Sequence, residues 1–231
     1  EFIEFVNFFD PAGDTLADKL RTVLAPLVAA GLDSIPGGGG EIFADAVRRK
    51  IGLGKCTAEA WLTVMRVAHE FGLNTSATMM FGHIEGVGDR IHHMELVRRW
   101  QDDAIRDFAA DGGGRYHAFI SWPFQPDNTP LGRLKAWGDV EGDDPDAPFP
   151  GDVVGLLDGS GDKELHPEFG RRLRLAGATT YLRTQALSRL YLDNIWSIGS
   201  SWVTMGPHIG QVALRFGAND MGSVMMEENV V

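Results

Sequence analysis

The stretch from Thr75 to Glu85 constrains the fold more than any other part of the sequence. Its first seven residues are small, β-branched or apolar, Gly82 follows them, and Glu85 comes three positions after the glycine. This pattern is typical of a buried parallel strand whose end lets a backbone or a ligand pass close by. We therefore predict a buried strand over residues 76–81.

Helical patterns flank this strand on both sides. Residues 57–71 form an amphipathic pattern that Thr57 is placed to cap, and residues 86–111 form a second one. A strand between two helices is the βαβ arrangement, in which ligands bind at the carboxyl ends of the strands. We expect Gly82, His83 and Glu85 to lie at that end.

The same alternation continues along the chain. Further helices are predicted over residues 15–30, with Asp14 as the N-cap, from residue 41 onward, and over residues 177–194 and 207–216. Further strands are predicted near residues 32–36, 116–122, 200–204 and 217–221.

All five strands read as parallel, which predicts an α/β fold and an incomplete (β/α) barrel with about five of its eight units. A doubly wound sheet is the alternative. It is disfavoured because glycine and polar residues recur at every strand end, as they do at a barrel mouth.

Two loops carry possible binding features. Four glycines, residues 37–40, stand between a predicted strand and a predicted helix, where backbone N–H groups can meet the polar edge of a ligand. The run lacks the spacing of known phosphate loops, so a flexible turn fits equally well. The second loop, residues 122–130, pairs two aromatic rings with two amides. It suits either a planar ligand or a packed proline-rich turn.

Residues 131–170 differ in character from the rest, because acidic side chains are spread among glycines and prolines. We predict a long surface loop or a partly disordered insertion within one partial barrel domain that spans residues 1–231.

Composition excludes several classes of function. The net charge of -11 and the lack of a Lys/Arg cluster argue against nucleic acid as a partner. No apolar run approaches the ~20 residues needed to span a bilayer, so we expect no membrane partner and a cytoplasmic protein. The single cysteine, Cys56, excludes an internal disulfide and any all-cysteine metal site built from this chain.

The histidines do not form a metal-binding pattern. His92 and His93 are adjacent, so they face different sides of a helix, and we expect them to be solvated or locally hydrogen-bonded. Metal-dependent hydrolysis through these two residues and His83 is therefore disfavoured, and no metal ligand is predicted.

Six segments together resemble the radical SAM dehypoxanthine futalosine cyclases of the futalosine route to menaquinone. They are residues 31–41, 77–85, 119–129, 187–194, 201–206 and 216–223. The likeness covers most of residues 24–130 and 175–231. Aminofutalosine synthase and the FO synthase subunit share the turn at 36–41 and the segment 82–85, but they are less similar over residues 122–126 and 201–204.

The resemblance implies a chemistry and a set of site residues. Such enzymes use an external electron donor to cleave S-adenosylmethionine at a 4Fe–4S cluster, and the resulting radical attacks a small nucleoside-derived substrate. The family pattern has Gly where this chain has Thr78. The residues implied beside S-adenosylmethionine are Pro36, Gly37, Gly38, Glu41, Met80, Gly82 and Glu85.

The substrate side is implied at strand ends. The candidates are Trp122, Gln125, Asn128, Trp202, Asn219 and Asp220. Rearomatising the cyclised ring requires loss of a proton, and His83 is the predicted acceptor because it titrates near neutral pH at the strand mouth.

One departure from the family stands out. The cluster of the family is held by a Cys-x-x-x-Cys-x-x-Cys loop, whereas this chain has only Cys56, which we expect to be an ordinary small residue. We therefore expect the chain to be the C-terminal part of a longer polypeptide, with no cluster ligands and no radical activity of its own. A cluster-less binding homologue is the alternative.

Overall fold

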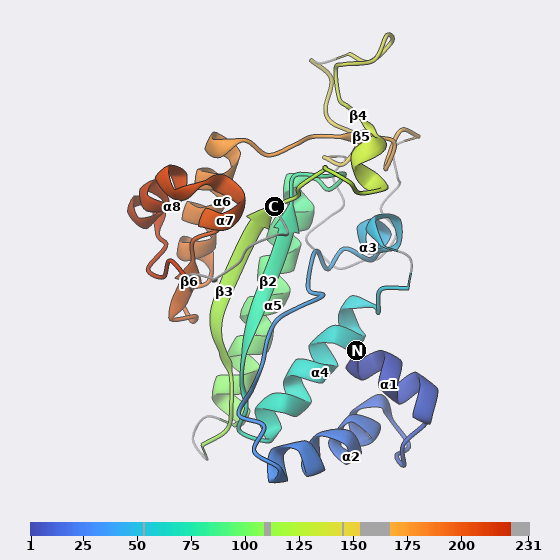
Figure 1. The fold of residues 1–231 in the computed structure, drawn as a ribbon, viewed down its shortest axis with the longest axis vertical. Helices are drawn as coiled ribbons and strands as arrows, with labels where there is room; N and C mark the ends of the chain where they lie inside the picture. The colour runs from blue at the N-terminus through green and yellow to red at the C-terminus, as the bar shows by residue number, and fades with distance from the viewer. Residues whose placement is uncertain (53, 109–111, 145, 153–166, 223–231) are drawn as a thin grey trace.

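A parallel sheet forms the centre of the computed structural model, which describes residues 1–52, 54–108, 112–144, 146–152 and 167–222. Its four strands pair in the order β1-β2-β3-β6 (Figure 1). They are β1 (Ser34–Ile35), β2 (Asn74–Phe81), β3 (Tyr116–Pro123) and β6 (Ser197–Gly199). The predicted α/β class with parallel strands is confirmed. The spatial order follows the chain order, as in a barrel, whereas a doubly wound sheet reverses its order. The barrel itself stays a prediction.

One face of the sheet is covered by the three crossover helices, α4 (Ala58–Glu70), α5 (Val87–Asp107) and α6 (Ala178–Tyr191). Ala77, Met79 and Phe81 are fully buried on this face. Alternate residues of a strand point to opposite faces, so their neighbours point the other way.

The second face, which we call the open face, carries side chains in matched rows. The strand register aligns Ser76 with Ala118 and Ser197, Thr78 with Ile120 and Gly199, and Met80 with Trp122. Most of the residues that β2 and β3 contribute to these rows are half-buried. The ladder therefore leaves a surface at which a ligand can lie.

The remaining helices lie at the two ends of the chain (Figure 1). They are α1 (Phe2–Phe9), α2 (Leu16–Ala29), α3 (Asp45–Ile51), α7 (Trp202–Met205) and α8 (Pro207–Ala213), with a 3-10 turn η3 (Leu214–Phe216) after α8. None of the described helices is long and apolar enough to cross a membrane.

Two helix starts differ from the expectation. Thr15, and not Asp14, caps α2, because its side chain accepts from the backbone of Asp18 while the Asp18 carboxylate accepts in return. The helix predicted from residue 41 begins only at Asp45. Thr57 caps α4 as predicted.

The strand predicted at residues 200–204 is wrong. The strand β6 ends at Gly199, and Trp202–Met205 form helix α7. Local side-chain hydrogen bonds favour the turn, because Ser201 Oγ pairs with Thr204 Oγ1 at 2.7 Å. The strand predicted at residues 217–221 is reduced to one parallel bridge between Gly199 and Asp220.

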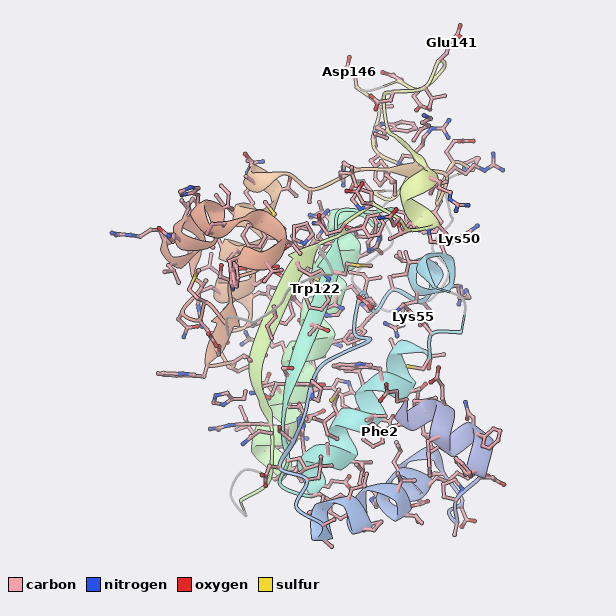
Figure 2. All side chains as sticks on the ribbon, viewed as in Figure 1. Phe2, Lys50, Lys55, Trp122, Glu141 and Asp146 are labelled. Carbon is pink, nitrogen blue, oxygen red and sulfur yellow. The ribbon has the colours of Figure 1, made fainter. Side chains whose placement is uncertain are left out.

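The acidic segment is a loop with a small ladder at its base. After the 3-10 turn η2 (Leu131–Arg133), β4 (Lys135–Ala136) pairs in parallel with β5 (Arg172–Leu173). Glu141 and Asp146 lie at its far tip, well away from Trp122 (Figure 2). Residues 145 and 153–166 of the predicted insertion lie outside the described residues.

Candidate functional site

The glycine run follows the edge of β2. The Gly37 amide donates to Ser76 Oγ at 2.8 Å, Thr78 Oγ1 donates to the Gly37 carbonyl at 2.5 Å, and the Met80 amide donates to the Glu41 carbonyl at 2.8 Å. The predicted S-adenosylmethionine-side residues 36–41 and Met80 are therefore brought together.

The four glycines divide into two kinds. A Cβ on Gly37 would overlap the Ser76 carbonyl, and a Cβ on Gly40 would come within 2.6 Å of the Thr78 carbonyl oxygen. Gly38 is exposed, and a Cβ there would meet no atom within 4 Å. Gly37 and Gly40 thus allow close packing, while the space around Gly38 is open.

Arg48 holds the run from below. Its side chain is 2% exposed, and its guanidinium donates to the carbonyls of Gly40 at 2.5 Å, Cys56 at 2.8 Å and Ile42 at 3.1 Å. Trp61 Nε1 adds a hydrogen bond of 3.0 Å to the Gly38 carbonyl. These anchors argue against the flexible-turn interpretation. Sequence reasoning missed Arg48, because a single arginine in a helical pattern carries no distinguishing signal.

Glu85 closes the loop that follows β2. Its side chain accepts from the Gly82 amide at 2.7 Å, the His83 amide at 2.8 Å and Arg90 Nε at 2.8 Å. Only 1% of the residue is exposed. Burial alone would raise the Glu85 pKa, but His83, Arg90 and the Gly82 amide lower it to about 2. The carboxylate therefore shapes the loop and offers no free oxygen to a ligand.

His83 is enclosed in the same cluster. Its ring is fully buried, Nδ1 lies 2.9 Å from Glu85 Oε2 and 2.8 Å from the Ile84 amide nitrogen, and Nε2 lies 3.3 Å from the Met80 carbonyl. Since the protein occupies both ring nitrogens, this geometry favours a positioning role. The proton-acceptor role stays a prediction.

Two segments from the long loop after β3 clamp this cluster. The Arg174 amide donates to the His83 carbonyl at 2.9 Å, and the Arg174 side chain pairs with Asp152 at 2.7 Å. A Cβ on Gly82 would come within 2.7 Å of Ala176 Cβ, so this glycine, with φ at 86°, is required for the contact.

Three of the predicted substrate-side residues lie near the same strand ends. Trp122 is half-buried beside Met80 on the open face. Gln125 and Asn128 follow in the exposed loop, where Gln125 Nε2 donates to the Pro123 carbonyl at 3.2 Å and Asn128 adopts φ of 58°.

The other three candidates lie elsewhere. Trp202 opens α7, and its side chain packs where a Cβ on Gly210 would be. Asn219 Oδ1 accepts from the Ile198 amide at 2.8 Å, next to the start of β6. Asp220 accepts from Ser197 Oγ at 3.1 Å. Asn219 and Asp220 therefore fasten the segment after η3 to β6, the edge strand of the sheet.

The expectation for the paired histidines is wrong for His93. Its ring is fully buried and stacks on Phe43, with centroids 3.9 Å apart. Burial and nearby Arg48 hold the pKa of His93 well below its usual range, so the ring is neutral. The described residues contain no group of three His, Cys, Asp or Glu side chains that could hold a metal ion.

The residues present do not fit a 4Fe–4S cluster, which is held by several cysteine thiolates. Cys56 is half-buried, and its sulfur lies 3.9 Å from Arg48 Nη2. For S-adenosylmethionine the donor set fits better, because Gly38 is exposed and the run that contains it is hydrogen-bonded along β2 as far as Met80.

Stability should fall in acid because of Glu85. Its pKa is 4.5 before folding and about 2 in the folded chain, so its contribution is complete above pH 4.5 and disappears as pH falls toward 2. The shift corresponds to about 3 kcal/mol. Urea unfolding between pH 6 and pH 2.5 should show this loss in the parent and in a Glu141→Gln control at the loop tip. Glu85→Gln should flatten the slope, and an unchanged slope in that variant would contradict the assignment.

Comparison with known proteins finds one matching family model and several similar enzymes. Residues 168–231 match the family model described as the CofH/MqnC C-terminal region. The chain is 37% identical over 211 residues to the aminodeoxyfutalosine synthase of Thermus thermophilus, covering 91% of this chain and 45% of that protein. It is 36% identical over 232 residues to the cyclic dehypoxanthine futalosine synthase of Halalkalibacterium halodurans, covering 98% and 50%.

A third relative has a different activity in its name. The 5-amino-6-(D-ribitylamino)uracil–L-tyrosine 4-hydroxyphenyl transferase of Methanopyrus kandleri is 33% identical over 220 residues, covering 95% of this chain and 47% of that protein. The chain thus spans about half the length of the curated relatives it matches. Identities of 37% and 36% do not separate the two futalosine enzymes.

Proposed function

We propose that this chain forms one wall of the pocket in a dehypoxanthine futalosine cyclase. The chain belongs to the radical SAM enzymes of the futalosine pathway and carries their C-terminal region. In that reaction a ribose-centred radical of the substrate closes onto the benzoate ring. The product is cyclic dehypoxanthine futalosine, in menaquinone biosynthesis.

The observation that carries the proposal is the position of the glycine run. Gly37 and Glu41, which flank its exposed glycines, hydrogen-bond to Ser76 and Met80 of β2, and Met80 is paired with Trp122. Bound S-adenosylmethionine supplies the deoxyadenosyl radical. The chain's own part is to hold polar ligand edges at Gly38, to exclude water with Met80 and to support a planar group on Trp122.

Other members of the family are second candidates. The identity of 37% to an aminodeoxyfutalosine synthase supports that reaction equally on similarity alone, and an FO synthase subunit is a further alternative. The single cysteine supports a cluster-less binding homologue. We favour the cyclase because the resemblance is strongest over the segments at residues 122–126 and 201–204.

Binding measurements on the chain test the pocket. Calorimetric titration with S-adenosylmethionine and, separately, with dehypoxanthine futalosine should detect both ligands. Gly38→Val should weaken S-adenosylmethionine binding at least tenfold, because the added methyl groups occupy the ligand's place. Gly177→Val is the matched control, since neither glycine has an atom within 4 Å of an added Cβ.

The outcomes separate the candidates. Loss of binding in Gly38→Val alone supports the pocket, while equal effects in both variants, or no binding to the parent chain, would overturn it. Binding of S-adenosylmethionine without dehypoxanthine futalosine would favour one of the other reactions. After anaerobic reconstitution we expect no iron–sulfur absorbance from the chain alone, since Cys56 is its only thiol.

A further inference from the structure

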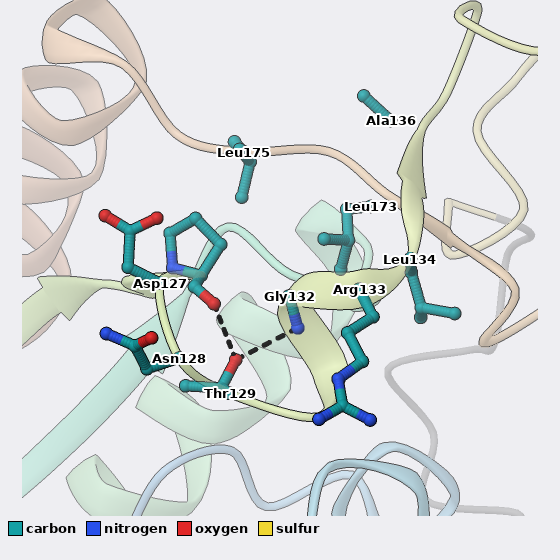
Figure 3. A pocket seen from close by; sticks show the side chains of 10 residues that line it. Asp127, Asn128, Thr129, Gly132, Arg133, Leu134, Ala136, Leu173 and Leu175 are labelled. Carbon is teal, nitrogen blue, oxygen red and sulfur yellow. Dashed lines mark hydrogen bonds between the residues drawn. The ribbon is translucent and has the colours of Figure 1, made fainter.

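A cavity of about 530 Å³ lies between residues 126–136 and residues 173–175 (Figure 3). This volume is within the range of small-molecule sites. Both walls belong to the long loop that leaves the carboxyl end of β3. We call this cavity the loop pocket. Among the predicted substrate-side residues, Asn128 lines it.

The first wall is a rigid turn. Thr129 Oγ1 donates to the Pro126 carbonyl at 2.9 Å and accepts from the Gly132 amide at 2.9 Å, as the dashed lines in Figure 3 show. A Cβ on Gly132 would overlap the Pro126 carbonyl, so only glycine allows this approach. The turn is therefore held in one shape before any ligand arrives.

The second wall is tied to the candidate site. Leu173 pairs with Ala136 in the β4–β5 ladder, and the Leu173 carbonyl accepts from the Trp137 amide at 2.8 Å. The next residue, Arg174, donates its amide to the His83 carbonyl at 2.9 Å. The loop pocket is thus fixed against the loop that ends β2.

Arg133 differs from the other arginines of this loop. Arg171, Arg172 and Arg174 pair with Glu168 at 3.2 Å, Asp143 at 2.9 Å and Asp152 at 2.7 Å, respectively. Arg133, by contrast, lines the cavity, and its guanidinium has no acidic partner in the described part of the chain.

Asp127 gives the pocket a second free charged group. Asp127 also lines the cavity, and its carboxylate has no hydrogen bond or ion pair to any described residue. Figure 3 shows the two side chains at opposite ends of the turn, with Leu173 and Leu175 on the facing wall. The pocket therefore offers a cation, an anion and an apolar surface to the same ligand.

We propose that the loop pocket binds the carboxylate-bearing aromatic part of the substrate. Arg133 pairs with the carboxylate through two N–H donors, the ring lies against Leu173 and Leu175, and Asp127 accepts from the ligand's hydroxyl groups. The inference rests on the proposed function for the identity of the ligand. A phosphate group fits less well, because its second negative charge would meet Asp127.

Benzoate and benzamide are suitable probes, because they share a ring and differ in charge. We expect calorimetric titration of the chain to detect benzoate binding at least tenfold tighter than benzamide binding. Arg133→Gln should weaken benzoate binding at least tenfold and leave benzamide binding unchanged. Lys135→Gln is the matched control. It removes the same charge two positions further along the chain, from a side chain that does not line the cavity.

Several results would overturn the inference. They are no benzoate binding to the parent chain, equal affinity for the two probes, or equal losses in Arg133→Gln and Lys135→Gln. Far-ultraviolet circular dichroism of both variants should match the parent, because the Arg133 and Lys135 side chains are exposed.

A second titration separates this inference from the proposed function. Asp127→Asn should weaken the binding of dehypoxanthine futalosine, because that ligand carries hydroxyl groups. Benzoate binding should be no weaker than in the parent. Benzoate binding that depends on Arg133, without binding of dehypoxanthine futalosine, would keep the pocket and reject the cyclase. Binding of dehypoxanthine futalosine that is unaffected by Arg133→Gln would keep the cyclase and reject the pocket.

Discussion

Replacing Arg90 by Met is expected to lower the free energy of unfolding by about 3–5 kcal/mol at neutral pH. Arg90 is 5% exposed, its Nη2 lies 2.7 Å from Glu85 Oε1, and its guanidinium lies over the Phe81 ring at 4.8 Å. Met conserves much of the apolar volume but leaves the buried Glu85 carboxylate without its cation. The loss should shrink below pH 4, as Glu85 takes up a proton.

Two further variants make this result specific. Arg99→Met removes an exposed arginine of the same helix that pairs with Glu95, and it should cost less than about 1 kcal/mol. Adding Glu85→Gln to Arg90→Met should recover part of the loss, because no unpaired charge is then buried. Urea unfolding of the parent, Arg90→Met, Glu85→Gln and the double variant measures the cycle, and additive effects of the two changes would contradict the proposed coupling.

Replacing Arg48 by Met is expected to cost at least about 3 kcal/mol and to loosen the glycine run. The buried guanidinium satisfies carbonyls of residues 39, 40, 42 and 56, and each unsatisfied buried carbonyl costs about 1–3 kcal/mol. Hydrogen exchange should accelerate at the amides of residues 38–42. It should stay unchanged in β3.

Arg49 supplies the matched control, because it is adjacent in the same helix and exposed. Arg49→Met should change stability by less than about 0.5 kcal/mol and leave the exchange of residues 38–42 unaltered. If both variants behaved alike, Arg48 would have no special role in anchoring the run. Measuring S-adenosylmethionine affinity in both variants then shows whether the anchored shape is needed for binding.

The sequence predicted the central strands well where the signal is local. The apolar run before Gly82 gave β2 almost to the residue, and Thr57 marked the start of α4 correctly. These features depend on patterning and capping, which act over a few neighbouring residues. The glycine run was likewise placed correctly between β1 and α3.

Of two errors, one has a local cause and the other depends on a distant contact. The apolar Trp202–Met205 segment looks like a strand, but Ser201 and Thr204 bond to each other and turn it into a helix. His93 is buried because Phe43, fifty positions earlier, stacks on it. Such partners have no signature in a single sequence.

The sequence indicated candidate site residues but not the role of each side chain. Gly38 is exposed and Met80 and Trp122 are half-buried neighbours on the open face, and their ligand contacts stay predictions. His83 and Glu85 were predicted to meet substrate and cofactor, whereas the structure buries both side chains in hydrogen bonds that shape the loop. Spacing alone does not distinguish a residue that contacts a ligand from one that positions a loop.

The glycines of the run are constrained by different contacts, and substitutions during evolution should reflect that difference. At Gly37 and Gly40 the neighbouring strand itself forbids a side chain, so every descendant that keeps the fold must keep those glycines. At Gly38 no protein atom imposes the same restriction. A lineage that still binds a ligand there should retain glycine at that position, and a lineage that has lost the ligand is free to drift only there.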